Sequence, residues 1–138
     1  LVLMHMQGTP ANMQQAPKYD DILVEIFDFL AERIGAAQQA GVKDIVLDPG
    51  FGFGKTLEQN YQLLKNIHIF DTLHFPVLAG LSRKQMIAGV LGMSPQEAGN
   101  GTTAAHMLAL AGGARILRVH DVKNAAEAIK IWKQYELA

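Results

Sequence analysis

One nonapeptide decides how the rest of the sequence is interpreted: Asp48-Pro49-Gly50-Phe51-Gly52-Phe53-Gly54-Lys55-Thr56. It follows the apolar run Ile45-Val46-Leu47, which is typical of a buried strand, and it precedes a helical pattern. Its alternating glycines permit backbone angles closed to other residues and a close approach to a flat ligand. The nonapeptide therefore predicts a small-molecule site at a strand end, with Asp48 at its centre. The alternative is a tight turn that Asp48 caps locally.

Two familiar phosphate-binding patterns do not fit this stretch. A P-loop requires a glycine five positions before Gly54, where the sequence has Pro49. The dinucleotide fingerprint requires G-x-G-x-x-G, whereas these glycines are spaced by two. We expect Lys55, beside the loop, to be an ordinary exposed lysine.

The composition limits the class of protein. The 138 residues fit one domain, 1–138, and the 49% apolar content is enough for a core. A net charge of −1 gives no reason to expect nucleic acid or an acidic membrane as a partner. The absence of cysteine is compatible with a reducing compartment, and we expect a cytoplasmic protein. Because residues 1–4 resemble the middle of a strand, we expect a piece of a longer protein.

Strand and helix patterns alternate four times along the chain. Strands are expected at 1–6, 45–47, 76–80 and 114–119, and helices at 22–40, from 57, from 84, at 102–111 and at 125–135. A polar loop is expected at 7–21. The order predicts an α/β fold with a parallel (β/α)4 arrangement. It is either half of a TIM (β/α)8 barrel, which the start in mid-strand favours, or an open doubly wound sheet.

Polar side chains lie at or just after the end of each expected strand, where ligands bind in both architectures. They are His5, Asp48, the run Ser82-Arg83-Lys84, and the pair Arg118 and His120. The last two are two residues apart, so on a strand they point the same way, and together they suit an anion such as phosphate. We interpret His5 as a core histidine.

Four ordered motifs resemble the bacterial dihydropteroate synthase family. They are residues 3–8 (Leu-Met-His-Met-Gln-Gly), the nonapeptide 48–56, residues 80–84 (Gly-Leu-Ser-Arg-Lys) and residues 118–122 (Arg-Val-His-Asp-Val). The resemblance covers the whole chain and implies the C-terminal half of a TIM barrel, from the fifth strand onward. It implies a transferase of folate biosynthesis that joins 6-hydroxymethyl-7,8-dihydropterin diphosphate to 4-aminobenzoate and releases diphosphate. Sulfonamide inhibition and a homodimer are also implied.

The resemblance assigns a pterin site to this chain. Asp48 would accept hydrogen bonds from the amino-amide edge of the pterin, and Lys84 would donate to its carbonyl and ring nitrogen. Arg118 would lie over the face of the pterin, Met4 would pack on the ring, and Phe53 would border the same site.

The resemblance assigns the remaining roles to a few of the same residues. Arg118 and His120 would hold the diphosphate, and Phe53 and Lys84 would border the aminobenzoate pocket that sulfonamides also occupy. Lys84, Arg118 and His120 are thus the expected catalytic residues. Gln85 stands where many members have serine, at the edge of the aminobenzoate pocket.

Other parts of the family pattern are missing from this chain. No metal ligand is expected here, because the asparagine that contacts Mg²⁺ belongs to the family's other half. We therefore expect this chain alone to be inactive. Two alternatives are a pterin-binding methyltransferase domain, against which the Ser-Arg-Lys and Arg-Val-His motifs argue, and a non-catalytic remnant.

Overall fold

The computed structural model describes residues 1–9, 13 and 17–138. Strands and helices alternate along these residues, as the sequence predicts. The elements are β1 (Val2–Met4), α1 (Ile22–Gln39), β2 (Val46–Asp48), α2 (Leu57–Lys65), the 3-10 helix η1 (Ile67–Leu73), β3 (Leu78–Ala79), α3 (Gln85–Leu91), α4 (Gly99–Ala111), β4 (Ile116–Leu117) and α5 (Val122–Glu136). The expected loop at 7–21 includes 10–12 and 14–16, which lie outside the described residues.

The strands are parallel and follow one another in chain order. β1 pairs with β2 so that Met4 lies opposite Asp48, and β3 pairs with β4. A parallel bridge between Leu47 and Val77 joins the two pairs. The spatial order is therefore β1-β2-β3-β4, and the predicted α/β fold with parallel strands is confirmed.

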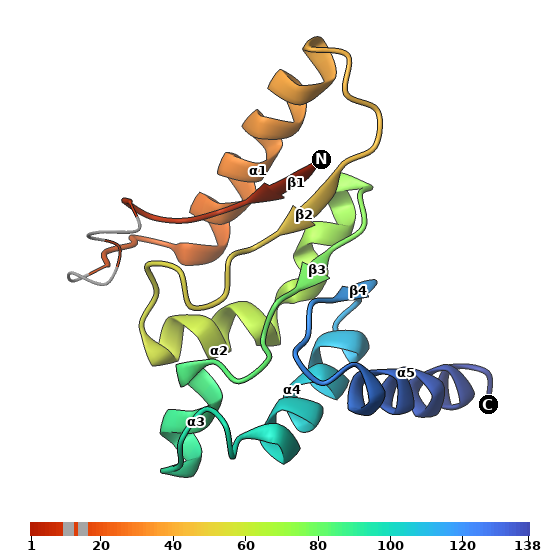
Figure 1. Ribbon diagram of the computed structural model, residues 1–138. Helices are drawn as coiled ribbons and strands as arrows, with labels where there is room; N and C mark the ends of the chain where they lie inside the picture. Colours follow the sequence, from red (N-terminus) through yellow and green to blue (C-terminus); the bar gives the residue numbers. More distant parts are fainter. Residues whose placement is uncertain (10–12, 14–16) are drawn as a thin grey trace.

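Helix α1 forms where the apolar period predicts it. Asp21 accepts hydrogen bonds from the amides of Leu23 and Val24, which caps the first turn. The four-residue repeat of Ile22, Ile26, Leu30 and Ile34 is buried. Figure 1 shows α1 running alongside β1 and β2, so this apolar stripe supplies one half of the core.

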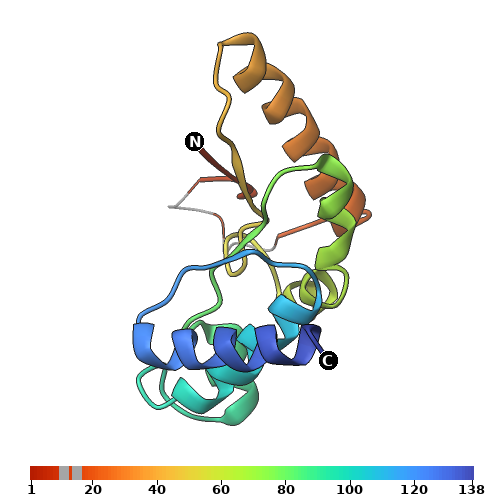
Figure 2. The ribbon, with the colours of Figure 1, turned by 90° about the vertical axis from the view of Figure 1, so that its right-hand side faces the viewer.

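The other half of the core lies lower in the molecule. Figure 2 shows α3, α4 and α5 gathered at that end, away from α1. Helix α2 begins at Leu57, as expected, with a capping box in which Thr56 and Gln59 each bond the other's backbone amide. Leu63 and Leu64 on α2 are fully or almost fully buried. Because α2 contacts α1 as well as α3 and α4, it joins the two halves of the core.

Two predicted helix starts are wrong. Helix α4 begins at Gly99, three residues before the expected 102, and the bonded pair Ser94 and Glu97 forms a turn ahead of it. A side chain at Gly101 would meet Leu91 at 2.5 Å, so that glycine serves helix packing and does not interrupt the helix. Helix α5 begins at Val122, with Asn124 inside its first turn.

Candidate functional site

The glycine loop after β2 packs directly on the end of β1. Gly50 has a φ of +75°, and a Cβ there would lie 1.8 Å from the carbonyl oxygen of His5. The buried amide side chain of Asn60 holds the loop from the other side, because its Oδ1 accepts the Gly52 N–H at 2.7 Å. The loop is thus fixed between a strand end and the first turns of α2.

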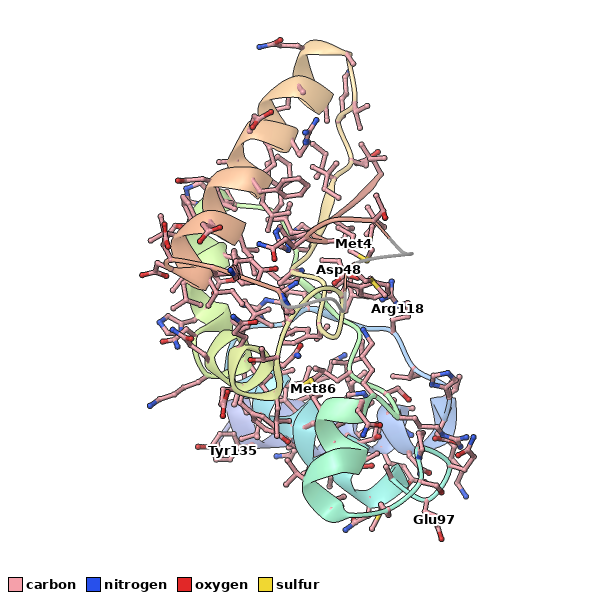
Figure 3. All side chains as sticks on the ribbon, turned by 90° about the vertical axis from the view of Figure 1, so that its left-hand side faces the viewer. Met4, Asp48, Met86, Glu97, Arg118 and Tyr135 are labelled. Atoms are coloured by element: carbon pink, nitrogen blue, oxygen red, sulfur yellow. The ribbon has the colours of Figure 1, made fainter. Side chains whose placement is uncertain are left out.

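Asp48 lies at the end of β2 and is completely buried. Its Oδ1 accepts a hydrogen bond from the Gly50 amide at 2.8 Å. Its Oδ2 lies 3.1 Å from Nη2 of Arg118, which is an ion pair but not an aligned hydrogen bond. Figure 3 shows Met4, Asp48 and Arg118 close together, which agrees with the pairing of Met4 opposite Asp48. A buried carboxylate therefore keeps one oxygen for a charged or ligand donor.

Lys84 reaches the glycine loop from the end of β3. Its Nζ donates a hydrogen bond to the carbonyl of Phe51 and lies 4.7 Å from the centre of the Phe53 ring. Burial lowers the pKa of Lys84 from 10.5 to about 8, although Asp48 partly opposes that shift and Arg118 adds to it. Lys84 therefore remains mostly a cation at neutral pH.

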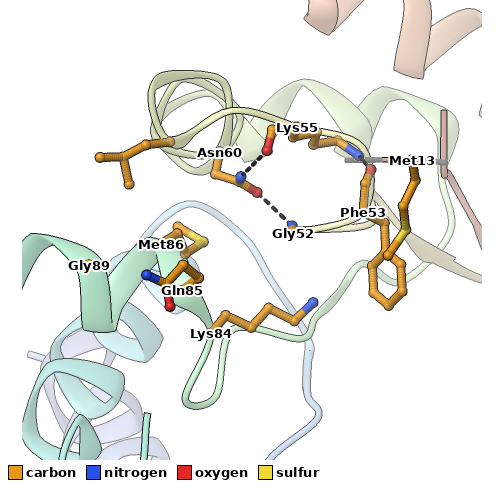
Figure 4. A pocket seen from close by; sticks show the side chains of 10 residues that line it. Met13, Gly52, Phe53, Lys55, Asn60, Lys84, Gln85, Met86 and Gly89 are labelled. Carbon is orange, nitrogen blue, oxygen red and sulfur yellow. Dashed lines mark hydrogen bonds between the residues drawn. The ribbon is translucent and has the colours of Figure 1, made fainter. Parts of the chain in front are cut away.

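A cleft of about 470 Å³ opens beside Lys84 and Phe53. Figure 4 shows Phe53 and Lys84 on one side of the cleft, with Gln85 and Met86 at the start of α3 on another. The cleft combines an aromatic ring, an amine and the Gly52 backbone. This combination suits a flat ligand of small size.

His120 lies in a shallow pocket of about 160 Å³ together with Lys84 and Arg118. The buried hydroxyl of Ser82 lies 2.9 Å from His120 Nδ1 and accepts the His120 backbone N–H at 3.2 Å. Gly80 forms the floor, since a Cβ there would lie 2.6 Å from Arg118 Nη2. The pocket presents cations and imidazole, as an anion site requires.

Lys55 contradicts the sequence prediction of an exposed lysine. Only 4% of its surface is accessible, and its Nζ contacts the carbonyls of Gly50 and Phe53 and Nδ1 of His5. The prediction failed because these acceptors become neighbours only when the loop folds onto β1. His5 itself is buried, as predicted for a core histidine.

The structure thus brings the predicted strand-end residues to one edge of the sheet. Asp48 pairs with Arg118, and Lys84 is shared between the cleft and the shallow pocket. Sequence reasoning named Ser82 but not its contact with His120, and it missed the supporting residue Asn60. One signal for Asn60 was available in the sequence: it is a polar residue at a position where the helix period requires an apolar one.

Known proteins share both this sequence and this fold. The family model for pterin-binding enzymes matches residues 1–120, and the chain belongs to that family. Within it, the chain is similar to dihydropteroate synthase of Escherichia coli (strain K12), with 47% identity over 131 residues that cover 94% of this chain and 46% of that protein. The Haemophilus influenzae dihydropteroate synthase is 43% identical over 133 residues, which cover 95% of this chain and 48% of that protein. The resemblance to this enzyme family is confirmed.

Solved structures agree. Yersinia pestis dihydropteroate synthase, in a sulfonamide drug complex, superposes with a TM-score of 0.95 at 43% identity, covering 98% of this chain and 50% of that one. The Thermus thermophilus enzyme in complex with 4-aminobenzoate gives a TM-score of 0.92 at 44% identity, and the match covers 96% of this chain and 55% of that one. The chain spans about half the length of the relatives it matches. Within the described residues, no helix is both long and apolar enough to cross a membrane.

Proposed function

We propose that residues 1–138 form one domain, the C-terminal (β/α)4 half of a dihydropteroate synthase barrel. The parent enzyme joins 6-hydroxymethyl-7,8-dihydropterin diphosphate to 4-aminobenzoate and releases diphosphate. The sequential order β1-β2-β3-β4 supports a half barrel, because a doubly wound sheet reverses its strand order at a switch point. The coverage of about half of each relative supports the same proposal.

The buried carboxylate of Asp48 carries this proposal. Its Oδ1 is satisfied by Gly50, and its Oδ2 faces Arg118. The amino-amide edge of a pterin offers the paired N–H donors that such a carboxylate accepts. Pterin binding then moves the guanidinium of Arg118 off Oδ2 and onto the face of the ring.

The neighbouring residues complete the pterin and aminobenzoate sites. Lys84 donates to the pterin carbonyl and ring nitrogen, and Met4 packs on the ring. Phe53 and Lys84 border the cleft in which 4-aminobenzoate, or a sulfonamide in its place, would lie. The structures of related enzymes with 4-aminobenzoate and with a sulfonamide drug support this choice of ligands.

The reaction relies on charge and position. The bond between the exocyclic methylene and the diphosphate oxygen breaks, and the amine of aminobenzoate forms the new C–N bond and loses a proton. Arg118 and His120 hold the departing diphosphate, and Ser82 keeps the His120 ring in place. The cleft and the shallow pocket share Lys84. The amine of aminobenzoate and the diphosphate group are therefore both held next to the reacting methylene carbon of the pterin substrate.

Several properties of the parent enzyme are part of the proposal. The part of the chain that the structure describes holds no cluster of three or more His, Asp or Glu side chains placed for a metal ion. The family resemblance, and not this finding, assigns the Mg²⁺ of the parent enzyme to the other half of the barrel, and no step above depends on it. A cytoplasmic homodimer follows from the resemblance.

Calorimetry with 6-hydroxymethyl-7,8-dihydropterin diphosphate tests the proposal. Asp48→Ala should weaken binding by roughly 2–5 kcal/mol, because a desolvated donor edge loses its acceptor. Asp28→Ala is the matched control, since Asp28 is exposed on α1. Unchanged affinity in Asp48→Ala would refute the pterin site.

A complementation assay tests catalysis. The chain alone is expected to give no dihydropteroate, whereas mixing it with the N-terminal half of the E. coli enzyme should restore product formation. A chain that binds pterin but never supports turnover in the mixture would be a non-catalytic remnant.

A further inference from the structure

The ammonium group of Lys55 lies among three acceptors. The carbonyl oxygens of Gly50 and Phe53 lie 2.8 and 3.0 Å from Nζ, and Nδ1 of His5 lies 3.1 Å from it. An ammonium has three donors and no acceptor, so it matches this set completely. Few lysines are buried without such compensation, because the desolvation of a lone ammonium costs several kcal/mol.

The partners of Lys55 come from two elements far apart in the sequence. His5 follows β1, whereas Gly50 and Phe53 belong to the glycine loop after β2. The His5 ring is itself fixed, packing edge-on against Phe29 at 5.1 Å between centroids. Lys55 therefore ties the loop to a rigid strand end and to α1.

The loop that Lys55 holds forms the wall of the cleft. Phe53 presents its ring to Lys84, and Gly52 has its amide held by Asn60. Figure 4 shows the side chain of Lys55 running toward the backbone of Phe53, and Lys55 is itself among the residues that line the cleft. Lys55 thus borders the cleft, while its Nζ is held by the carbonyls of Gly50 and Phe53 and by His5.

We propose that Lys55 and His5 form a positioning pair, which fixes the carbonyls of Gly50 and Phe53 and so sets where Phe53 stands in the ligand cleft. The identity of the ligand rests on the proposed function, whereas the control of loop conformation does not. The three contacts of the Lys55 Nζ all go to the loop and to His5. The pair acts through the loop.

The contact between the pair survives a change of protonation. As an ammonium, Lys55 donates to both carbonyls and to the lone pair of His5 Nδ1. As an amine, it donates to both carbonyls and accepts from Nδ1–H after the imidazole changes tautomer. Asp48 and Lys84 are the charged groups that face Lys55, one favouring and one opposing its charge. The contact between Lys55 and His5 therefore does not depend on whether Lys55 is an ammonium or an amine.

Hydrogen exchange of the loop amides tests the tie without any ligand. Lys55→Met keeps most of the length of the side chain and removes its donors, and exchange at Phe53 and its neighbours should accelerate at least tenfold. Lys123→Met, at an exposed position on α5, should leave these amides unchanged. Equal protection in Lys55→Met and in the unchanged protein would overturn the proposal.

Substitutions at His5 separate positioning from simple packing. His5→Asn places an amide oxygen near the position of Nδ1, whereas His5→Phe keeps an aromatic ring but offers no acceptor. His5→Asn should bind 4-aminobenzoate within about threefold of the unchanged protein, and His5→Phe should bind at least tenfold more weakly. If the ring-preserving variant bound better than the acceptor-preserving one, packing alone would explain His5, and the pair would be rejected.

The two proposals fail differently. If the unchanged protein bound neither 4-aminobenzoate nor pterin, the proposed function would fail, while loop exchange in the His5 and Lys55 variants would still decide on the pair. If Lys55→Met failed to fold, the comparison of the two His5 variants would decide.

Discussion

Arg83 donates two hydrogen bonds to Asp121, from Nε to Oδ2 at 3.1 Å and from Nη2 to Oδ1 at 2.8 Å. This fork joins the loop after β3 to the residue that precedes α5. Arg83 has a φ of +56°, which non-glycine residues rarely adopt and which other contacts must maintain. Its amide donates to Thr102 Oγ1 at 3.1 Å, so α4 also takes part. Ser82 and His120, which contact each other, each directly precede a residue of the fork, so we expect the fork to hold that contact in place.

Breaking the fork between Arg83 and Asp121 should weaken the binding of an anion and should lower the free energy of unfolding only slightly. The ion pair that Asp121→Ala removes is already partly exposed to solvent. The loss in unfolding free energy should therefore be about 1 kcal/mol or less. Affinity for inorganic diphosphate, measured by calorimetry, should fall roughly three- to tenfold because His120 loses its orientation. Glu32→Ala breaks the exposed contact with Arg33 and serves as the control. A large loss of stability with normal affinity would assign the fork to folding instead.

Two glycine substitutions should have opposite consequences. In Gly80→Ala the three atoms nearest the new Cβ all belong to the guanidinium of Arg118, the far end of a flexible side chain, so the protein should fold and Arg118 should move away from Asp48. In Gly50→Ala it meets the backbone of His5 at 1.8 Å and the φ is unfavourable, so folding should fail. Circular dichroism and pterin calorimetry distinguish the outcomes. A fully binding Gly80→Ala protein would contradict the proposed role of Arg118.

The sequence predicted the local structure better than it predicted the residues that hold the site in place. Helix α1 and the Thr56–Gln59 capping box depend on residues within a few positions, so the pattern alone is sufficient. The position of Asp48 at a strand end was also readable. Lys55 was not, because burial of a loop lysine depends on His5, which lies 50 residues away. Similarly, the need for Gly101 appears only when α3 packs against it.

Acid should destabilise the protein partly through His5. Burial, and then the nearby Lys55 charge, lower the pKa of His5 from 6.5 to about 4. The unfolded chain therefore binds a proton between pH 6.5 and 4 that the folded protein does not. Unfolding free energy should fall by roughly 3 kcal/mol as the pH drops through this window. His5→Asn should flatten the profile there, as measured by urea denaturation. An unchanged profile would mean that folded and unfolded His5 titrate alike.

The outer face of α5 should mediate self-association. Ile131 and Tyr135 are 66% and 72% exposed, and Trp132 packs against Tyr135 at 5.5 Å between ring centroids. Residues four apart share a helix face, so these side chains form an apolar surface that a second copy of the chain would cover. Sedimentation velocity at low micromolar concentration should show a dimer.

Substitution on this face identifies the interface. Ile131→Lys combined with Tyr135→Lys should shift the dimer to monomer without lowering the unfolding free energy of the monomer, because both positions are exposed. Lys130→Ala, on the same helix, is the control. A dimer that persists in the double variant would place the interface at the outer edge of β1 instead, where Leu1 and Val2 are exposed and an edge strand offers a second route to association.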